Sequence, residues 1–145
     1  MSYIETIARG ICAKGGKVLL CRGRKAGNLY FPGGHIDFGE RGATALEREV
    51  LEETGLASKV TAFLGVCEHR FLQNGSEDHA EINLVYALEI PDADPEKPVE
   101  AKEGWIAFDW IPASELASSA VEPAALRKVA LDWLAAPDAS KNRIV

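Results

Sequence analysis

The chain has 145 residues, of which 47% are hydrophobic and 26% charged, and its net charge is −6 at neutral pH. This length and composition predict one globular domain over residues 1–145, and no apolar run approaches the roughly 20 residues that a membrane helix requires. The negative charge argues against the basic surface with which proteins hold a nucleic-acid backbone, so we expect neither a stable nucleic-acid complex nor a membrane partner.

The N-terminal segment and the cysteines indicate a cytoplasmic protein. The first ten residues lack the basic start and the apolar stretch of a signal peptide. The three cysteines, Cys12, Cys21 and Cys67, form no CxxC pair, so they indicate neither a zinc site nor a disulfide framework. They fall among apolar residues, and we therefore expect buried, reduced thiols.

The first quarter of the chain predicts a β-hairpin followed by a basic loop. Residues 4–12 and 17–21 are apolar and β-branched enough to form strands, and the Lys-Gly-Gly sequence at 14–16 is typical of a turn. Residues 22–28 are basic and turn-prone. A short extended piece at 29–31 then leads into a pair of glycines, which would allow the backbone to approach a ligand closely.

The next segment, residues 42–54, predicts an amphipathic helix. Ala43, Leu46 and Val50 recur at spacings of three and four, so they should face the core. Gly55 follows where a helix end is expected, because glycine adopts a left-handed conformation without steric cost.

Three glutamates of this helix are expected to share one patch. Glu49, Glu52 and Glu53 are spaced so that they project to one side of the helix, about a quarter turn from the apolar stripe. Like charges held this close repel each other, and the nearest base is Arg48. A divalent cation would relieve the repulsion, and Mg²⁺ or Mn²⁺ prefers oxygen ligands of this kind.

The second half of the chain predicts more strands and a second helix. Residues 59–71 and 80–90 favour the two strands of a long antiparallel hairpin. Beyond a proline-rich acidic loop, residues 105–110 are expected to form the last strand, and 122–135 has the spacing of a helix that covers the sheet. The tail from residue 137 shows no periodicity and is expected to be loosely held.

The segment from Gly34 to Leu56 also resembles a known motif, the Nudix box. Its pattern is glycine, five residues, glutamate, seven residues, arginine-glutamate, an aliphatic residue, one residue, two glutamates, one residue, glycine and an aliphatic residue. A complete match at fixed spacing is a strong signal, unlike a lone glycine motif. The nine defined positions are Gly34, Glu40, Arg48, Glu49, Val50, Glu52, Glu53, Gly55 and Leu56.

The resemblance implies a fold and a reaction. The fold would be an α/β (α+β) sandwich with a mixed, partly antiparallel sheet between helices. The reaction would be the Mg²⁺- or Mn²⁺-dependent hydrolysis of a phosphoanhydride bond in a nucleoside diphosphate linked to another moiety. Candidate substrates are nucleoside triphosphates, damaged nucleotides, nucleotide sugars, ADP-ribose and dinucleoside polyphosphates.

Alternatives to this function remain open. One is a ligand-sensing domain that keeps the fold without turnover, although such domains usually show a damaged box. Another is an isomerase acting on an isoprenoid diphosphate, for which the chain has no local signature. Relatives are often dimers, so a homodimer is an alternative to a monomer, and no feature of the sequence locates an interface.

The resemblance also implies roles within the box. Besides binding the metal, Glu52 would help to deprotonate the attacking water. Arg48 and Glu40 would orient the metal ligands, since a guanidinium can fork two hydrogen bonds to a carboxylate. Gly34 and Gly55 would be structural, and His35 and Asp37 are assigned to local turn structure. The implied metal ligands are the backbone carbonyl of Gly33 and the carboxylates of Glu49, Glu52 and Glu53.

Two acids before the last strand are further candidates. Relatives often contribute another metal-binding or basic glutamate from this region, so either Glu100 or Glu103 would serve, or both are solvated loop residues. Glu103 is favoured because the adjacent Gly104 and Trp105 suggest a fixed turn. Trp105 itself and Trp110 are assigned mainly to the core and the sheet edge.

Candidate substrate contacts lie elsewhere on the predicted strands and loops. Arg22 and Arg24 are able to approach substrate phosphates, although exposed bases in such a loop commonly face solvent. Tyr30 is a candidate for stacking on a base, with core packing as the alternative. Glu68 and Arg70 share one face of their strand and would either line a cleft or form an ordinary cross-strand ion pair.

Overall fold

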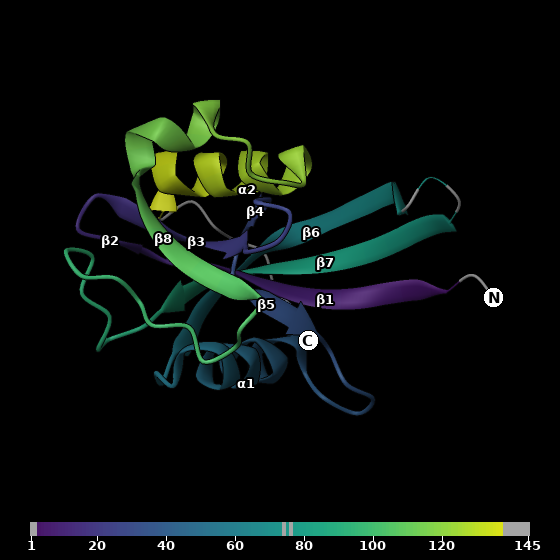
Figure 1. Cartoon of the computed structure of the whole chain (residues 1–145), viewed down its shortest axis with the longest axis horizontal. Helices are drawn as coiled ribbons and strands as arrows, with labels where there is room; N and C mark the ends of the chain where they lie inside the picture. Colours follow the sequence, from purple (N-terminus) through teal and green to yellow (C-terminus); the bar gives the residue numbers. More distant parts are fainter. Residues whose placement is uncertain (1–2, 74, 76, 138–145) are drawn as a thin grey trace.

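Two β-sheets lie between two helices, with α1 on one side and α2 on the other (Figure 1). The computed structural model describes residues 3–73, 75 and 77–137. This layering confirms the predicted α/β sandwich with a mixed sheet between helices. The tail predicted to be loosely held lies, from residue 138 on, outside the described residues.

The first sheet has the strand order β5-β1-β7-β6 and carries the long predicted hairpin. Strand β1 pairs in parallel with β7 and antiparallel with β5, and β7 pairs antiparallel with β6. The alternation of apolar residues correctly predicted the β6–β7 hairpin. The four strands span Gly33–His35 (β5), Ile4–Ile11 (β1), Glu77–Glu89 (β7) and Lys59–Gln73 (β6).

The second sheet corrects the predicted opening hairpin. The turn is in the expected place, where Gly15 and Gly16 have φ values of 58° and 74°. However, the strand that pairs with β3 across it is the two-residue β2, whereas β1 belongs to the other sheet. Strand β8 pairs with the other edge of β3. The strands span Ala13–Lys14 (β2), Lys17–Gly23 (β3), Leu29–Tyr30 (β4) and Ile106–Pro112 (β8).

The two helices begin and end where local signals place them. Helix α1 spans Gly42–Thr54, as predicted, and ends at Gly55, whose φ of 73° is left-handed. The short 3₁₀ helix η1 covers Ala113–Ser118, after the last strand. Helix α2 spans Ala124–Ala135 and starts two residues later than predicted, because Pro123 occupies the N-cap position.

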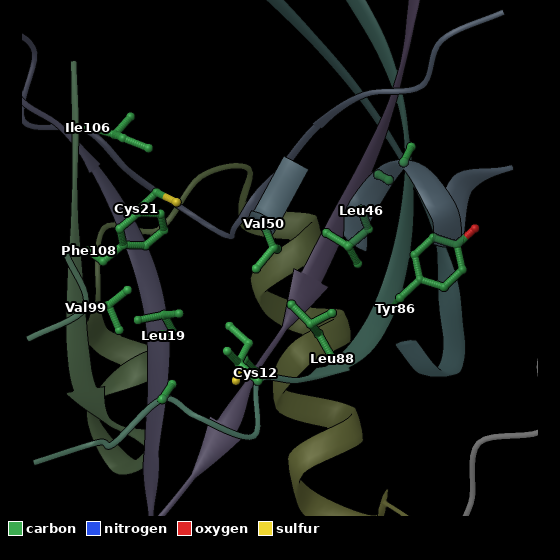
Figure 2. Close-up of a cluster of buried hydrophobic side chains, with 14 residues drawn as sticks. Cys12, Leu19, Cys21, Leu46, Val50, Tyr86, Leu88, Val99, Ile106 and Phe108 are labelled. Atoms are coloured by element: carbon green, nitrogen blue, oxygen red, sulfur yellow. The ribbon is translucent and has the colours of Figure 1, made fainter. Parts of the chain in front are cut away.

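Each helix covers one buried cluster of apolar side chains. Under α1, Leu46 and Val50 pack with Leu19, Leu88 and Phe108, which come from both sheets (Figure 2). A second cluster lies under α2. Fully burying one such side chain contributes roughly 1.5–3 kcal/mol, so these clusters fix the helices on the sheets. In particular, they fix the rotation of α1 about its axis, which decides where its glutamates point.

The cysteines are buried and free, as predicted for reduced thiols. Burial raises the pKa of the Cys12 thiol to about 11 and also raises the pKa of Cys21 and Cys67. In contrast, the assignment of Trp105 to the core or the sheet edge is wrong, since its side chain is 63% exposed. Trp105 precedes the first residue of β8, so the alternation of inward and outward side chains along that strand does not direct its side chain into the core.

No helix in the described part of the chain combines the length and the apolar character needed to cross a bilayer.

Candidate functional site

The first glycine of the box lies directly against a box glutamate. Strand β5 pairs with β1 so that Gly34 is opposite Ala8, and the Glu49 side chain from α1 lies over Gly34. A Cβ atom at Gly34 would be 2.5 Å from Cδ of Glu49 and 2.7 Å from both carboxylate oxygens. A side chain at this position would displace the Glu49 carboxylate, so glycine allows that carboxylate to lie against the strand.

Arg48 and Glu40, to which the resemblance assigned an orienting role, form a forked pair with each other. Nε of Arg48 donates to one Glu40 oxygen at 2.8 Å, and Nη2 donates to the other at 3.0 Å. The Arg48 hydrogen bond, together with the backbone N–H of Asp37, holds the pKa of Glu40 below its usual value. This planar pair joins the loop before α1 to the middle of the helix.

The same guanidinium contacts two of the predicted metal ligands. Its Nη1 donates to Glu49 at 3.0 Å and lies 3.4 Å from Glu52. Nη2 also donates to the backbone carbonyl of His35 at 3.1 Å, so Arg48 bridges helix α1 and strand β5. Arg48 thus offsets the repulsion between neighbouring carboxylates and fixes where they lie.

Glu53 is the most perturbed carboxylate of the site. Burial, followed by the nearby charge of Glu49, raises its pKa to about 8, and Arg9 opposes this shift. Its Oε2 atom is buried and has no hydrogen-bond partner among the described residues. A buried carboxylate oxygen without a donor is costly unless a cation or proton compensates it.

The donor set fits a hard divalent cation. Glu49, Glu52 and Glu53 offer only oxygen atoms, and the unpaired Oε2 of Glu53 lacks the partner that a cation would supply. In the part of the chain described, no three carboxylate, imidazole or thiol side chains already converge at metal-ligand distance. The Glu52 side chain is 53% exposed, so its conformation is the least restricted of the three. The residues therefore fit the cation chemically.

Of the two acids in the loop before β8, Glu103 acts electrostatically on the site, whereas Glu100 pairs with a lysine. The charge of Glu103 contributes to the raised pKa of Glu53. Glu100 is 82% exposed and pairs with Lys102 at 3.5 Å. The backbone N–H of Lys102 donates to the carbonyl of Glu53 at 2.7 Å, and this bond anchors the loop on the end of α1.

Two predicted substrate-contacting arginines hold the pair of strands β3 and β8 together. Arg22 lies 2.6 Å from the carboxylate of Asp109, which is diagonally opposite it on β8. Nε of Arg24 donates to the carbonyl of Ile106 at 2.9 Å, next to the exposed Trp105. Contact of either arginine with a substrate stays a prediction.

The other predicted substrate residues lie in two places. Tyr30 is half-buried, and the Arg9 guanidinium lies 5.4 Å from its ring centre. Arg9 also acts on Glu53, so Tyr30 and Glu53 have this arginine in common. Glu68 and Arg70 are exposed on β6, with His69 between them stacked on Phe71 on the opposite face. The structure thus brings Tyr30 to the box and leaves Glu68 and Arg70 on the surface of the hairpin.

Sequence reasoning missed two residues of the site. Arg9 donates to the carbonyl of Phe31 at 3.1 Å and lowers the pKa of Glu53. The sequence feature that could have identified Arg9 is its position as a lone cation within an apolar strand. Asp37 is more than a local turn residue. Its backbone N–H donates to Glu40 at 3.1 Å, and its carboxylate lies 3.6 Å from Arg48. Only the loop that folds back on α1 brings Asp37 there.

Replacing Arg48 with lysine tests the orienting role. Lysine keeps the charge but cannot fork onto Glu40 while also contacting Glu49 and Glu52. We expect Arg48→Lys to lower kcat by about 10- to 100-fold, the usual effect of losing a group that orients metal ligands, and to raise the Mg²⁺ concentration needed for half-maximal rate. Steady-state kinetics over a range of Mg²⁺ concentrations measure both. Unchanged kinetics would remove this role.

Comparison with known proteins agrees with this geometry. The family model described as NUDIX domain matches residues 5–134. An ADP-ribose pyrophosphatase from Methanocaldococcus jannaschii is 33% identical over 97 residues, which are 65% of this chain and 56% of that protein. A putative mutator protein MutT4 from Mycobacterium tuberculosis is 36% identical over 97 residues, covering 67% of this chain and 37% of that protein. The chain thus spans about half or less of the length of these curated relatives.

Solved structures show the same fold. A MutT NUDIX hydrolase from Burkholderia pseudomallei has a TM-score of 0.72 and 23% identity, and the match covers 90% of this chain and 98% of that one. A MutT protein from Methanosarcina mazei has a TM-score of 0.71 and 19% identity, covering 94% and 97%. At this identity the likeness concerns the fold alone, whereas the family match spans most of the sequence and includes the whole box. The chain therefore belongs to the Nudix family.

Proposed function

We propose that the protein is a divalent-metal-dependent pyrophosphohydrolase that cleaves a nucleoside diphosphate linked to another moiety. One observation supports this proposal above the others: Glu53, a glutamate of the complete box, has a buried carboxylate oxygen without a hydrogen-bond partner among the described residues. A sensing domain would not need that costly arrangement. The curated relative named ADP-ribose pyrophosphatase supports the same class of substrate.

The residues divide the chemistry among them. Glu49, Glu52, Glu53 and the carbonyl of Gly33 would hold Mg²⁺ or Mn²⁺, which when bound neutralises charge on the phosphoryl oxygens. Glu52 is the most exposed of these carboxylates, so we assign to it the acceptance of a proton from the attacking water. Arg48 fixes Glu49 and Glu52.

A substrate panel with product identification tests this function. The protein is incubated with ADP-ribose, nucleoside triphosphates, an oxidised nucleoside triphosphate, nucleotide sugars and a dinucleoside polyphosphate, with Mg²⁺ or with EDTA. We expect Mg²⁺-dependent release of a phosphate-containing product from at least one compound. Binding across the panel without release of any product would instead support the ligand-sensing alternative.

The two loop acids give a matched pair of variants. Glu103→Gln removes a charge that acts on Glu53, whereas Glu100→Gln removes an exposed charge that pairs with Lys102. We expect Glu103→Gln to lower kcat by about 10-fold or more, the lower range for a positioned acid or base, and Glu100→Gln to change it less than about twofold. Kinetics at saturating substrate measure both variants, and equal effects would show that the loop contributes no specific residue.

A further inference from the structure

One edge of the first sheet is open along a regular stretch of β6. Strand β6 is the last strand in the order β5-β1-β7-β6, and in the described part of the chain no strand pairs with its outer edge. Its register against β7 shifts near Val60 and Phe63 but is continuous from Val66 to Gln73. Figure 1 shows the far end of the β6–β7 hairpin extending beyond both helices. This stretch therefore presents a row of backbone groups that a further strand could pair with.

The stretch lacks several features that keep an edge strand from pairing. Residues 66–72 contain no proline, no lysine and no bulge, each of which commonly protects a sheet edge. The stretch also exposes two apolar side chains, since Val66 is 54% and Leu72 is 65% exposed. A regular edge with exposed apolar side chains is a template for another strand.

The sequence of the stretch favours a second copy of the chain as the partner, because it is complementary to itself when two copies run antiparallel. With the two strands centred on His69, Glu68 of each copy is directly opposite Arg70 of the other. In the same register, Val66 of each copy is opposite Leu72 of the other. Directly opposite residues share a face of the sheet, and these four side chains are all exposed on one face of β6.

The charges also select this register over its neighbours. Moving the centre by one residue toward the N-terminus places Glu68 opposite Glu68, and moving it the other way places Arg70 opposite Arg70. Like charges directly opposite each other destabilise a strand pair. Arginine has five N–H donors, so Arg70 can contact Glu68 of the other copy in addition to groups of its own chain.

The antiparallel arrangement leaves room for the bodies of both copies. The part of β6 that is covered by α2 includes Leu64, which is only 7% exposed and belongs to the apolar cluster under that helix. Leu64 lies outside the paired residues 66–72, and the two strands run in opposite directions. The covered parts of the two copies therefore lie at opposite ends of the paired stretch.

We propose that the protein forms a homodimer in which the β6 strands of two copies pair antiparallel about His69, joining two four-stranded sheets into one continuous sheet. The Glu68–Arg70 and Val66–Leu72 contacts each occur twice by symmetry. A short strand pair forms an interface at the weak end of the range, so the dimer is reversible, with a dissociation constant of roughly 1–100 μM. Because β6 and the box strand β5 are opposite edges of the sheet, this surface does not depend on the proposed function.

Exchanging the two charges tests the proposal. Sedimentation equilibrium of the wild type, from roughly 1 to 500 μM, should show a monomer–dimer equilibrium. Glu68→Arg and Arg70→Glu each place like charges opposite each other, and each should weaken dimerisation by about 10-fold or more. The double variant with both changes has opposite charges facing again and should recover the wild-type affinity to within about threefold.

The control variant is Glu115→Arg, which reverses an exposed charge on η1 and should leave dimerisation unchanged. Far-UV circular dichroism checks that every variant is folded. A wild type that stays monomeric over the whole range would overturn the proposal. Unchanged dimerisation in both single variants, or no recovery in a folded double variant, would also overturn it.

A disulfide tests the register without altering the two charges. In the proposed dimer His69 is directly opposite His69 of the other copy, whereas Leu72 lies roughly 20 Å from its counterpart. Under mild oxidation, His69→Cys should therefore form a covalent dimer at least about 10-fold faster than Leu72→Cys, because a disulfide requires close Cα atoms. Non-reducing electrophoresis measures both, with the wild type as background, since its cysteines are buried. Equal rates in the two variants would contradict the pairing about His69.

Discussion

Glu53→Gln is expected to lower kcat by at least about 100-fold, the scale of removing a positioned catalytic group. Glutamine has nearly the same shape as glutamate but no negative charge, so the variant removes one ligand charge and leaves the packing of α1 in place. Glu53 is the carboxylate with a buried, unpaired oxygen, and neither Glu49 nor Glu52 shares that feature in the described structure. Wild-type turnover in Glu53→Gln would overturn the assignment of the metal site.

The same variant should stabilise the protein in EDTA at alkaline pH. The pKa of Glu53 is raised from 4.5 to about 8 in the folded protein, so the folded state holds this proton more tightly than the unfolded state. The corresponding stability is fully present below about pH 4.5 and is lost as the pH rises through about 8. Glutamine does not ionise and avoids this loss.

Thermal unfolding in EDTA at pH 5 and pH 8.5 measures the effect. We expect the wild type to lose more stability than Glu53→Gln between these two pH values, and saturating Mg²⁺ to restore the wild type at pH 8.5. Activity and stability would then change in opposite directions in one variant, as expected for a group kept in a costly environment for function. If the wild type and Glu53→Gln lost stability equally, the ionisation of Glu53 would not be the cause of the loss at alkaline pH.

Gly33→Ala is expected to cost about 3 kcal/mol or more of unfolding free energy, which lowers the melting temperature by roughly 10 °C in a domain of this size. The φ of Gly33 is 142°, a conformation that other residues rarely adopt. A Cβ atom there would also collide with the carbonyl oxygen of Ala8 on the neighbouring strand β1. Because the colliding atom belongs to the backbone, a rotamer change cannot relieve the clash.

Gly16→Ala is the matched control for this prediction. Gly16 also has a positive φ, 74°, but no heavy atom lies within 4 Å of a Cβ atom placed there. Its cost should be confined to backbone strain of about 1 kcal/mol. Thermal or urea unfolding of both variants isolates the contribution of the clash. A loss in Gly33→Ala no larger than that in Gly16→Ala would contradict the proposed close approach of β5 and β1.

The sequence predicted the local elements of the site because they depend on neighbours in the chain. Helix α1 was predicted at both ends, since its apolar stripe has helical spacing and Gly55 ends it. The resemblance assigned Arg48 and Glu40 to orienting the ligands, but their pairing with each other depends on the loop that folds back on α1. The order of strands and helices followed from apolar alternation and from turn residues.

What the sequence could not predict depends on contacts between distant segments. Strand β1 pairs with β7, more than 70 residues away, and nothing in its pattern distinguishes this partner from the adjacent β3. The raised pKa of Glu53 requires its burial and the charges of other residues, among them Glu103 from another loop.

Binding of Mn²⁺ tests the central claim most directly, because it measures the cation site without requiring the substrate to be known. The free ion is followed by electron paramagnetic resonance as the protein is titrated at pH 7.5, and Mg²⁺ is then added as competitor. We predict saturable binding of Mn²⁺ to the wild type, displacement by Mg²⁺, and an affinity at least about 10-fold weaker in Glu53→Gln. Equal Mn²⁺ affinity in the two proteins, or no binding to either, would contradict the account.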